Sequence, residues 1–386
     1  MRSVLQTIGL LFAVVLLAGC GIFSRDDGQI APAELVEFTP TLEVEQLWSV
    51  STGRGMSRSQ PNLRPFYEGG RIWVGDHRGR VVAVSADSGR VERRFDTDIE
   101  LSAGPVVQEG LILLGSFDGE LVALDAESGE ERWTAGLSSE VLSYPVLHEG
   151  VVVVRCVDGR IFGLDAENGR RLWIHDRSVP LLTLRGTSDP LARAGQVFIG
   201  YDDGMVIGLR VADGSVLWEQ RVSEREGRTE LERLADIDGP MAIVGTELYV
   251  VTYRGRMAGL ALDSGRMQWV KDVSSHSGLS LRRTQLAASD RDDAVWLVDR
   301  RSGATLWRDE QLKRRQLTRP VFYGSQIVVV DKEGYLHFYD AGTGEFSARI
   351  RASRNRPSDA PLVVGNTLYL LDDDGTLSAW RAGPRD

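Results

Sequence analysis

The chain has 386 residues and a formal net charge of −10 with its histidines neutral. This acidic balance argues against a nucleic-acid partner. The five histidines are scattered without paired metal-ligand spacing, and the sequence contains neither a Gly-x-Ser-x-Gly elbow nor a phosphate-binding loop. The sequence therefore predicts no metal, no cofactor and no catalytic residue.

The N-terminus has the pattern of an exported lipoprotein. Arg2 is followed by an apolar run over residues 8–18 that is too short to span a bilayer, and Leu17-Ala18-Gly19 then leads into Cys20. Small residues directly before a cysteine resemble a bacterial lipobox, which implies cleavage of residues 1–19 and lipidation of Cys20. Gly21, rather than Asp, after the cysteine implies sorting to the outer membrane. The alternative is a signal peptide cut elsewhere, with an incidental cysteine.

Residues 20–41 carry no repeat signal and are predicted to be the lipidated cysteine and a flexible tether. Cleavage would remove one basic residue and no acidic residue, which changes the net charge from −10 to −11. The mature chain would retain only Cys156 besides the acylated cysteine, so no internal disulfide could form. Cys156 lies in an apolar run and is predicted to be buried.

From residue 42 to residue 383 a unit of about 40 residues recurs eight times. Gly79, Gly119 and Gly159 are spaced by 40 residues, which is the length of a four-stranded propeller blade. Strands are predicted over 111–116 and 120–125, because these runs flank an Asp-Gly pair that suits a hairpin turn. A proline is predicted to open the first strand of most units. The degenerate sixth unit has its turn at 289–293 and its third strand at 294–299.

An aromatic residue recurs near the end of the unit, as expected where neighbouring sheets pack together. The tryptophans in this slot are Trp133, Trp173, Trp218, Trp269 and Trp307. Arg93 and Ala348 occupy the slot in two units, and Phe95 is a candidate substitute for the first. The last unit lacks a fourth strand, whereas residues 44–50 contain Trp48 and belong to no other unit. We therefore predict an all-β, eight-bladed propeller of four-stranded antiparallel blades, closed by the N-terminal strand.

Charged residues within the repeat have plain structural explanations. Aspartates recur at the same place in each unit, so turn and cap chemistry accounts for them together. The basic clusters at Lys313-Arg314-Arg315 and residues 349–356 fall between units. Solvated crossing loops are the favoured interpretation, with a site for an anionic partner as the alternative.

Two neighbouring connections between units are longer than the others. The span from the aromatic slot to the next proline is 12 or 13 residues in ordinary connections, but 17 before Pro190 and 22 before Pro240. Long loops on one face of a repeat ring commonly form its binding surface. Leu182 and Leu184 alternate in the first loop, and Asp236 and Asp238 alternate in the second. Either these residues form a docking site, or the leucines pack beneath their own loop while the aspartates cap turns.

The unit Asp-Gly-x-x-x-Ala-Leu-Asp-Ala-x-Ser-Gly-x-x-x-Trp, intact over residues 118–133, resembles the repeats of quinone-dependent alcohol dehydrogenases. Those enzymes are longer and carry an adjacent Cys-Cys disulfide over the cofactor, which is absent here. A lipobox followed by eight repeats, with the segments 180–186 and 233–238, resembles the BamB family, lipoproteins of the outer-membrane β-barrel assembly machinery.

The BamB resemblance implies a non-enzymatic scaffold, anchored on the periplasmic face of the outer membrane, that aids insertion of barrel proteins. It also implies docking of the partner BamA through Leu182, Leu184, Arg185, Asp236 and Asp238. Other assembly-machinery subunits and unfolded barrel precursors are further partners that it suggests. The alternatives are a quinone-cofactor-dependent periplasmic dehydrogenase or sensor, and a cell-wall or peptide-binding propeller that uses exposed strand edges.

Overall fold

The computed structural model describes residues 31–55, 62–177, 188–224 and 235–385. All regular elements within these ranges are β-strands. No helix in this part of the chain is long and apolar enough to cross a membrane.

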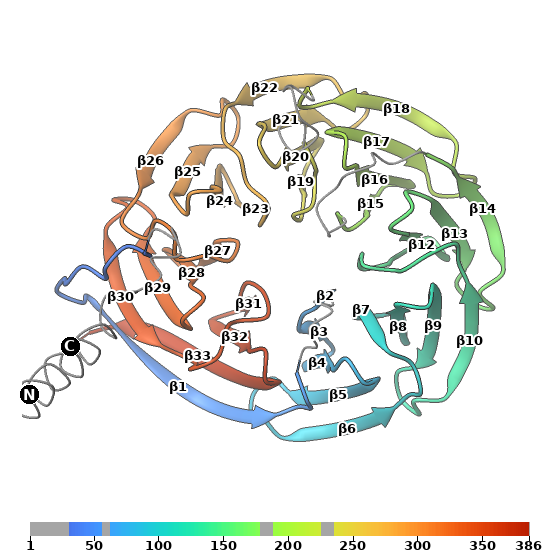
Figure 1. Cartoon of the computed structure of the whole chain (residues 1–386), viewed down its shortest axis with the longest axis horizontal. Coiled ribbons are helices and arrows are strands. Elements are labelled where there is room, and N and C mark those ends of the chain that lie inside the picture. The colour runs from blue at the N-terminus through green and yellow to red at the C-terminus, as the bar shows by residue number, and fades with distance from the viewer. Residues whose placement is uncertain (1–30, 56–61, 178–187, 225–234, 386) are drawn as a thin grey trace, which may run out of the picture. The chain divides into compact units, whose positions relative to one another are not determined.

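The strands form eight sheets arranged in a closed ring (Figure 1). From the innermost strand outward, the first four blades are β3(Phe66–Glu68), β4(Arg71–Gly75), β5(Arg80–Ser85), β6(Val91–Asp96); β7(Leu101–Gln108), β8(Leu111–Ser116), β9(Glu120–Asp125), β10(Glu131–Gly136); β11(Val146–His148), β12(Val151–Arg155), β13(Ile161–Asp165), β14(Arg171–His175); and β15(Leu191–Arg193), β16(Gln196–Gly200), β17(Met205–Arg210), β18(Val216–Arg221).

The other four blades have the same antiparallel order. They are β19(Ala242–Val244), β20(Glu247–Val251), β21(Met257–Ala261), β22(Met267–Lys271); β23(Leu279–Arg282), β24(Gln285–Ser289), β25(Val295–Asp299), β26(Thr305–Asp309); β27(Val321–Tyr323), β28(Gln326–Val330), β29(Tyr335–Asp340), β30(Phe346–Arg351); and β31(Leu362–Val364), β32(Thr367–Leu371), β33(Thr376–Pro384), β1(Leu42–Ser51). The eight-bladed propeller predicted from the sequence is confirmed. One short strand was not predicted: β2(Asn62–Leu63) pairs in parallel with β7 in the second blade.

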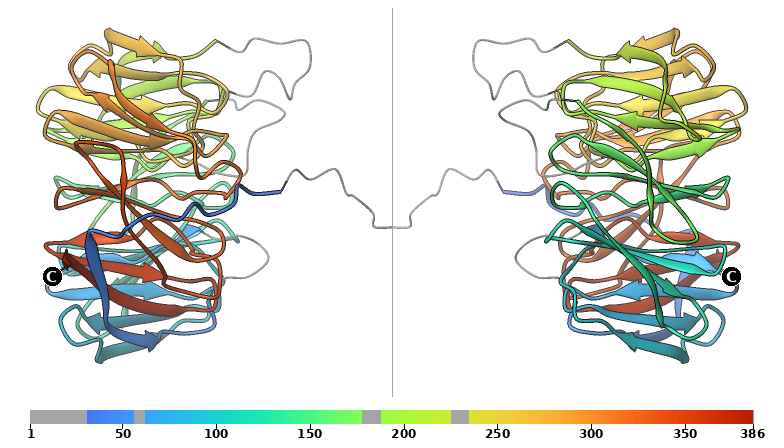
Figure 2. Two further views of the ribbon diagram at one scale, coloured as in Figure 1. Left: turned by 90° about the vertical axis from the view of Figure 1, so that its left-hand side faces the viewer. Right: turned by 90° about the vertical axis from the view of Figure 1, so that its right-hand side faces the viewer.

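The N-terminal strand closes the ring, as predicted. β1 pairs antiparallel with β33 from Leu42 opposite Pro384 to Ser51 opposite Thr376. Viewed edge-on, β1 lies along the outside of the eighth blade (Figure 2). A buried core between the eighth and first blades, which includes Tyr369 and Ile72, joins the two ends of the array.

An aromatic ring packs on a turn glycine at every joint between blades except that of the seventh and eighth, where Ala348 occupies the slot. Trp133 packs its ring against Gly169 of the next blade and donates its indole N–H to the carbonyl of Ala166 at 2.9 Å. A Cβ on Gly169 would lie 2.6 Å from that ring, and its φ of +70° also favours glycine. Phe95 packs in the same way against Gly129, which accounts for Arg93 in the slot of the first unit. Cys156 is fully buried, as predicted, and burial raises the pKa of its thiol.

Residues 33–41 lie against the seventh blade. The amide of Ala33 donates to the carbonyl of Lys313 at 2.9 Å, and the ring of Phe38 stacks on Phe346 with centroids 5.3 Å apart. Leu35 packs on the core between the sixth and seventh blades. The predicted tether ended at residue 41, whereas the structure shows these nine residues bound to the propeller. A flexible linker can therefore extend no further than residue 32.

The expectation of solvated crossing loops is wrong for part of the basic clusters. Arg315 is 4% exposed, donates to Asp331 and Glu333 at 2.6 Å each, and also donates to the carbonyl of Ala33. Arg349 donates to the carbonyl of Val36 at 2.7 Å. These two side chains fix residues 33–41 in place, whereas Arg351, Arg354 and Arg356 are exposed.

Candidate functional site

The candidate site lies where the connection before β19 meets the turn between β16 and β17. The structure describes this connection from residue 235 onward. The amide of Ile237 donates to the carbonyl of Tyr201 at 3.2 Å, and the carbonyl of Asp236 accepts from the amide of Tyr253 at 2.8 Å. The side chain of Ile237 is fully buried in the core between the fourth and fifth blades. The backbone of this segment is therefore fixed by turns of both neighbouring blades.

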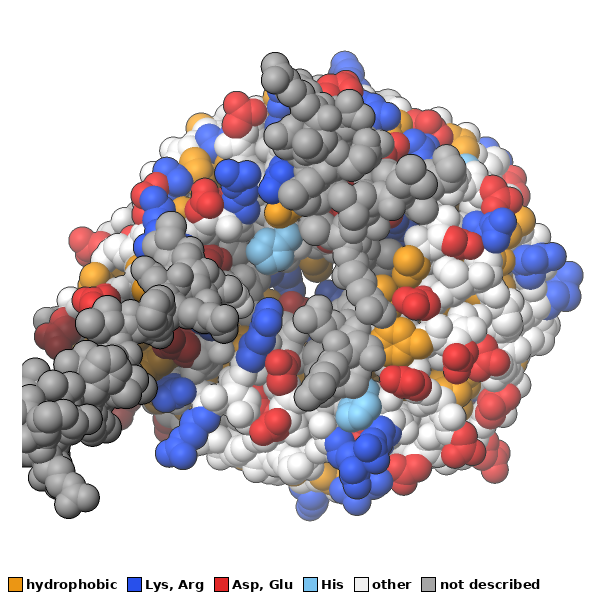
Figure 3. All heavy atoms as spheres, viewed as in Figure 1, with side chains coloured by type: hydrophobic (Ala, Val, Ile, Leu, Met, Phe, Trp, Pro, Cys, Tyr) orange, Lys and Arg blue, Asp and Glu red, His pale blue; other side chains and the backbone are white. Residues whose placement is uncertain are grey.

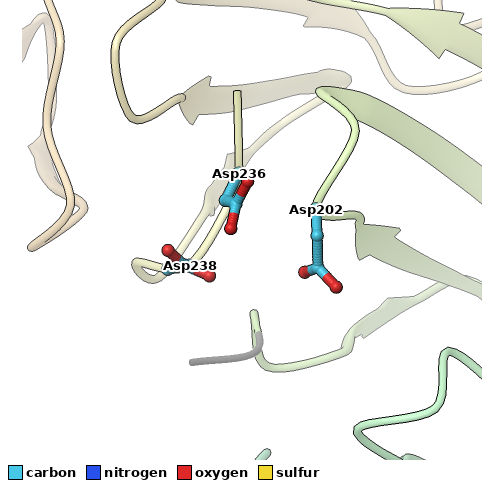
Figure 4. A group of neighbouring side chains, drawn as sticks. All are labelled: Asp202, Asp236 and Asp238. Carbon is cyan, nitrogen blue, oxygen red and sulfur yellow. The ribbon is translucent and has the colours of Figure 1, made fainter. Parts of the chain in front are cut away.

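The alternation in this segment brings two predicted site residues together. Ile237 is directed into the core, and the carboxylates of Asp236 and Asp238 lie with that of Asp202 in a group (Figure 4). One oxygen of each carboxylate lies within 4.8 Å of the other two. Asp236 is 0% exposed and Asp202 is 3% exposed. The pairing of Asp236 with Asp238 follows from the sequence pattern, but the participation of Asp202 was not predicted.

A buried arginine supports this group from the third blade. Arg155 ends β12 and is 0% exposed. It donates from Nη2 to Oδ1 of Asp202 at 2.7 Å and from Nη1 to the carbonyl of Gly200 at 2.8 Å. Its guanidinium also lies 5.0 Å from the ring centroid of Tyr201. Arg155 therefore connects the third blade to the turn that carries Asp202.

Arg155 interrupts the repeat pattern, and its role was not predicted from the sequence. The residue stands four positions before the turn glycine of its unit. The corresponding residues of the other units are small or apolar: Gly75, Gly115, Gly200, Val251, Ser289, Val330 and Leu371. Because burying a charged side chain requires a partner, a charge in an otherwise uncharged slot indicates a specific contact.

Asp238 is the least buried member of the group. Both carboxylate oxygens of Asp238 are buried, and neither has a hydrogen-bond partner among the described residues. Burial, followed by the charges of Asp236 and Asp202, raises the pKa of Asp238 well above its usual value, although Arg155 opposes this rise. Such a group suits a basic partner group, and its three carboxylates are also close enough to hold a metal ion.

The other predicted site residues are not described. Leu182, Leu184 and Arg185 lie outside the described residues, as does Cys20. The two residues of the second loop, Asp236 and Asp238, are therefore the part of the predicted docking site that the structure places.

Comparison with known proteins identifies the family. Residues 78–309 and 291–383 match the family model described as outer membrane protein assembly factor BamB. The assembly factor BamB of Alkalilimnicola ehrlichii is 48% identical over 371 residues, which cover 96% of this chain and 95% of that protein. That of Pseudomonas aeruginosa is 44% identical over 364 residues, which cover 94% of this chain and 96% of that protein.

This chain belongs to the BamB family. The crystal structure of BamB from Moraxella catarrhalis agrees with the fold: its TM-score is 0.79 at 28% identity, and the match covers 88% of this chain and all of that one. The quinohemoprotein alcohol dehydrogenase from Comamonas testosteroni matches with a TM-score of 0.68 at 14% identity, covering 89% of this chain and 77% of that one. At this identity the likeness concerns the fold alone, and the quinone-dependent alternative is not favoured.

Proposed function

We propose that this chain is a scaffold in the assembly of outer-membrane β-barrel proteins and that it has no catalytic activity. The observation that carries this proposal is its near full-length similarity to relatives named as outer membrane protein assembly factors, at up to 48% identity in those compared above. A scaffold acts by binding, so the proposal requires a surface that recognises another subunit.

That surface is proposed to dock BamA through Leu182, Leu184, Arg185, Asp236 and Asp238. The acidic group around Asp236 and Asp238 supports it, because a polar rim around an apolar anchor is typical of protein interfaces. The two leucines would supply the anchor, and Arg185 would add a donor for polar contacts. The backbone hydrogen bonds of Asp236 and Ile237 hold the acidic part in a fixed position, which lowers the entropic cost of docking.

Co-purification of BamA with the tagged, membrane-extracted protein tests the docking surface. Replacing an interface anchor by alanine typically costs about 2 kcal/mol or more, so Leu182→Ala should reduce BamA recovery strongly. Arg185→Ala and Asp238→Asn should also reduce recovery. Leu172→Ala is the matched control, because Leu172 is an exposed leucine on β14 and is not among the proposed docking residues. Normal BamA recovery with Leu182→Ala and Arg185→Ala would reject this surface.

The proposed location is the periplasmic face of the outer membrane, with Cys20 as the lipid anchor. Several acyl chains on one residue give stable anchoring, whereas a single chain does not. Cys20→Ala should therefore leave an unprocessed protein that fractionates away from the outer membrane. Retention of this variant in the outer-membrane fraction would contradict lipidation at Cys20.

A further inference from the structure

A cavity of about 600 Å³ lies on the axis of the propeller, and residues of all eight blades line it. The recurring prolines Pro65, Pro145, Pro190, Pro240 and Pro361 form part of its wall. The residue before a blade's proline therefore reaches the axis as well. Several of these positions carry charged or polar side chains: Arg64, Tyr144, Asp189 and Arg319.

The first axial arginine, Arg64, has its partners within the protein. It forms an ion pair with Asp189 and lies 3.8 Å from Oδ2 of Asp359. Its guanidinium also covers the ring of Tyr144, 4.0 Å from the centroid. Burial opposes its charge, but the two carboxylates and Tyr144 hold the pKa of Arg64 above its usual value. The guanidinium of Arg64 is thus already paired within the protein and is a poor candidate for binding a ligand.

The second axial arginine, Arg319, has far fewer hydrogen-bond and ion-pair partners. Its Nη1 donates to Oγ of Ser280 at 2.8 Å, but its buried Nε has no hydrogen-bond partner among the described residues. Arg319 also forms no ion pair within 4 Å in this part of the chain. Since a guanidinium carries five N–H donors and a buried charge is costly without an acceptor, Arg319 retains donors for an additional group.

Arg319 and Asp359 also line a second cavity of about 450 Å³, so they lie where the two cavities meet. Arg291, Arg356 and His276 line this second cavity too. Three arginines thus line this cavity together with Asp359 and Asp293. The oxygens of Asp293 accept the amides of Gln316 and Leu317 at 2.8 Å each, so that carboxylate already has partners.

The axial opening is visible in the space-filling view, where Lys and Arg side chains lie at its edge (Figure 3). Three arginines and two aspartates line the second cavity, so basic side chains outnumber acidic ones there, even in a chain whose net charge is −10. The guanidinium of Arg356 forms no hydrogen bond and no ion pair within 4 Å with other described residues, although its charge acts on Asp373, so its N–H donors are available to a ligand.

We propose that Arg319 and Arg356 bind the oxyanion group of a small molecule, a carboxylate or a phosphate, at the junction of the two cavities. The planar fork of each guanidinium matches the paired oxygens of both groups. Phe66, Met241 and Val321 line the axial cavity and would contact an apolar body on the ligand. The residues of this site are not among the proposed docking residues, and the proposal does not depend on the proposed function.

Calorimetric titration of the purified, full-length protein in chloride-free buffer tests the site. The probes are inorganic phosphate, phenyl phosphate and benzoate, with the neutral benzyl alcohol as the control ligand. We expect saturable binding of at least one anion with a Kd of about 1 mM or tighter, and weaker binding of benzyl alcohol by about tenfold or more. The preferred anion distinguishes a phosphate from a carboxylate ligand.

Arg319→Met should weaken anion binding by about tenfold or more, because it removes a charge-assisted contact while keeping an aliphatic chain of similar length. Arg319→Lys should restore part of the loss, since it keeps the charge without the fork. Arg354→Met is the matched control: Arg354 is exposed on the same connection as Arg356 and lines neither cavity.

Absence of saturable anion binding to the wild-type protein would overturn the proposal, as would equal affinity for benzyl alcohol. Unchanged affinity in a folded Arg319→Met variant would overturn it as well. If that variant fails to fold, Arg356→Met decides the question because Arg356 is exposed and its replacement should not affect folding. Unchanged affinity in Arg356→Met would then reject the site, and weakened affinity would support it.

Discussion

The indole N–H of Trp48 donates to the carbonyl of Ala86 at 3.2 Å, and this contact joins the last blade of the propeller to the first. The ring also packs against Gly89, where a Cβ would lie 2.6 Å away. Trp133 makes the same two contacts with Ala166 and Gly169 at an ordinary joint. The closing joint therefore uses the same packing as the joints formed by consecutive blades.

Trp48→Ala should destabilise the propeller by about 2–3 kcal/mol, less than is usual for loss of a fully buried aromatic side chain, because Trp48 is only half-buried. It should also broaden the unfolding transition, because a propeller with an open joint can unfold from its ends. Denaturant unfolding followed by circular dichroism measures both effects. Trp133→Ala is the matched control: it weakens a joint that the continuous chain still connects.

Deleting residues 43–50 is the stronger form of this experiment. It removes most of β1 and leaves the edge of β33 without its partner. Loss of a single cooperative transition is expected. A full-height, single melting transition in the truncated protein would show that closure by β1 is not needed for cooperativity.

The regular part of this fold could be predicted from the sequence because the repeat presents the same local pattern eight times. The expected strands at 111–116 and 120–125 coincide with β8 and β9, and the expected strand at 294–299 differs from β25 by one residue. Turn glycines and strand alternation act over a few residues, so they can be recognised locally.

Contacts between distant residues could not be predicted in this way. Arg155 and Asp202 are 47 residues apart, and Arg315 binds Ala33 across 282 residues. No local pattern specifies such pairs. The alternation of Asp236 with Asp238 was a local signal and placed those two together, but only the fold brings Asp202 to them.

Arg155→Met should destabilise the protein by about 3–5 kcal/mol, because removing one partner leaves the carboxylate of Asp202 buried without its counter-charge. Adding Asp202→Asn should recover part of this loss, since the double variant no longer leaves Asp202 as a buried charge without its partner. Chemical denaturation of the two single variants and the double variant gives the coupling energy.

Arg160→Met provides the comparison for a solvent-exposed pair. Arg160 donates to Asp176 at 2.6 Å at the surface, and exposed ion pairs contribute little. No measurable change in stability is expected for this variant. Equal effects of Arg155→Met and Arg160→Met would contradict the structural role of the buried pair.

Asp238→Asn should stabilise the protein at neutral pH. The folded-state pKa of Asp238 is raised, so the folded protein holds this proton more tightly than the unfolded chain does. Its contribution is favourable below the ordinary pKa of 3.8 and is lost as the pH rises through the folded-state pKa. The groups that set this balance are Asp236, Asp202 and Arg155.

Melting temperatures measured from pH 4 to pH 8 test this prediction. The wild-type protein should lose stability relative to Asp238→Asn as the pH rises. Asp263→Asn, a change at an exposed turn aspartate, is the control for replacing a carboxylate by an amide. Parallel profiles for wild type and Asp238→Asn would show that Asp238 is ionised without cost in the folded protein.

The stability that His337 contributes should depend on pH in the direction opposite to that of Asp238. His337 is fully buried; its Nδ1 accepts from Nε of Arg349 at 3.1 Å, and its Nε2 lies 3.0 Å from Asp331. An acceptor at Nδ1 and a donor at Nε2 require the neutral ring with its proton on Nε2. Burial lowers the pKa of His337, although Asp331 opposes this effect, while Arg349 and Arg315 add to it.

A lowered folded-state pKa means that the stability His337 contributes is fully present above its ordinary pKa of 6.5 and is lost as the pH falls through the folded-state pKa. The pKa of Asp331 is also lowered, so its own contribution is lost only below 3.8, in a separate window. His337→Gln keeps a side-chain donor but does not titrate. Its melting temperature should therefore fall less than that of the wild type between pH 6.5 and pH 4.5.

Arg349 also binds the carbonyl of Val36, so protonating His337 should weaken the attachment of residues 33–41. Limited proteolysis over the same pH range, read at this segment, would detect that release, and cleavage independent of pH in both proteins would argue against the coupling.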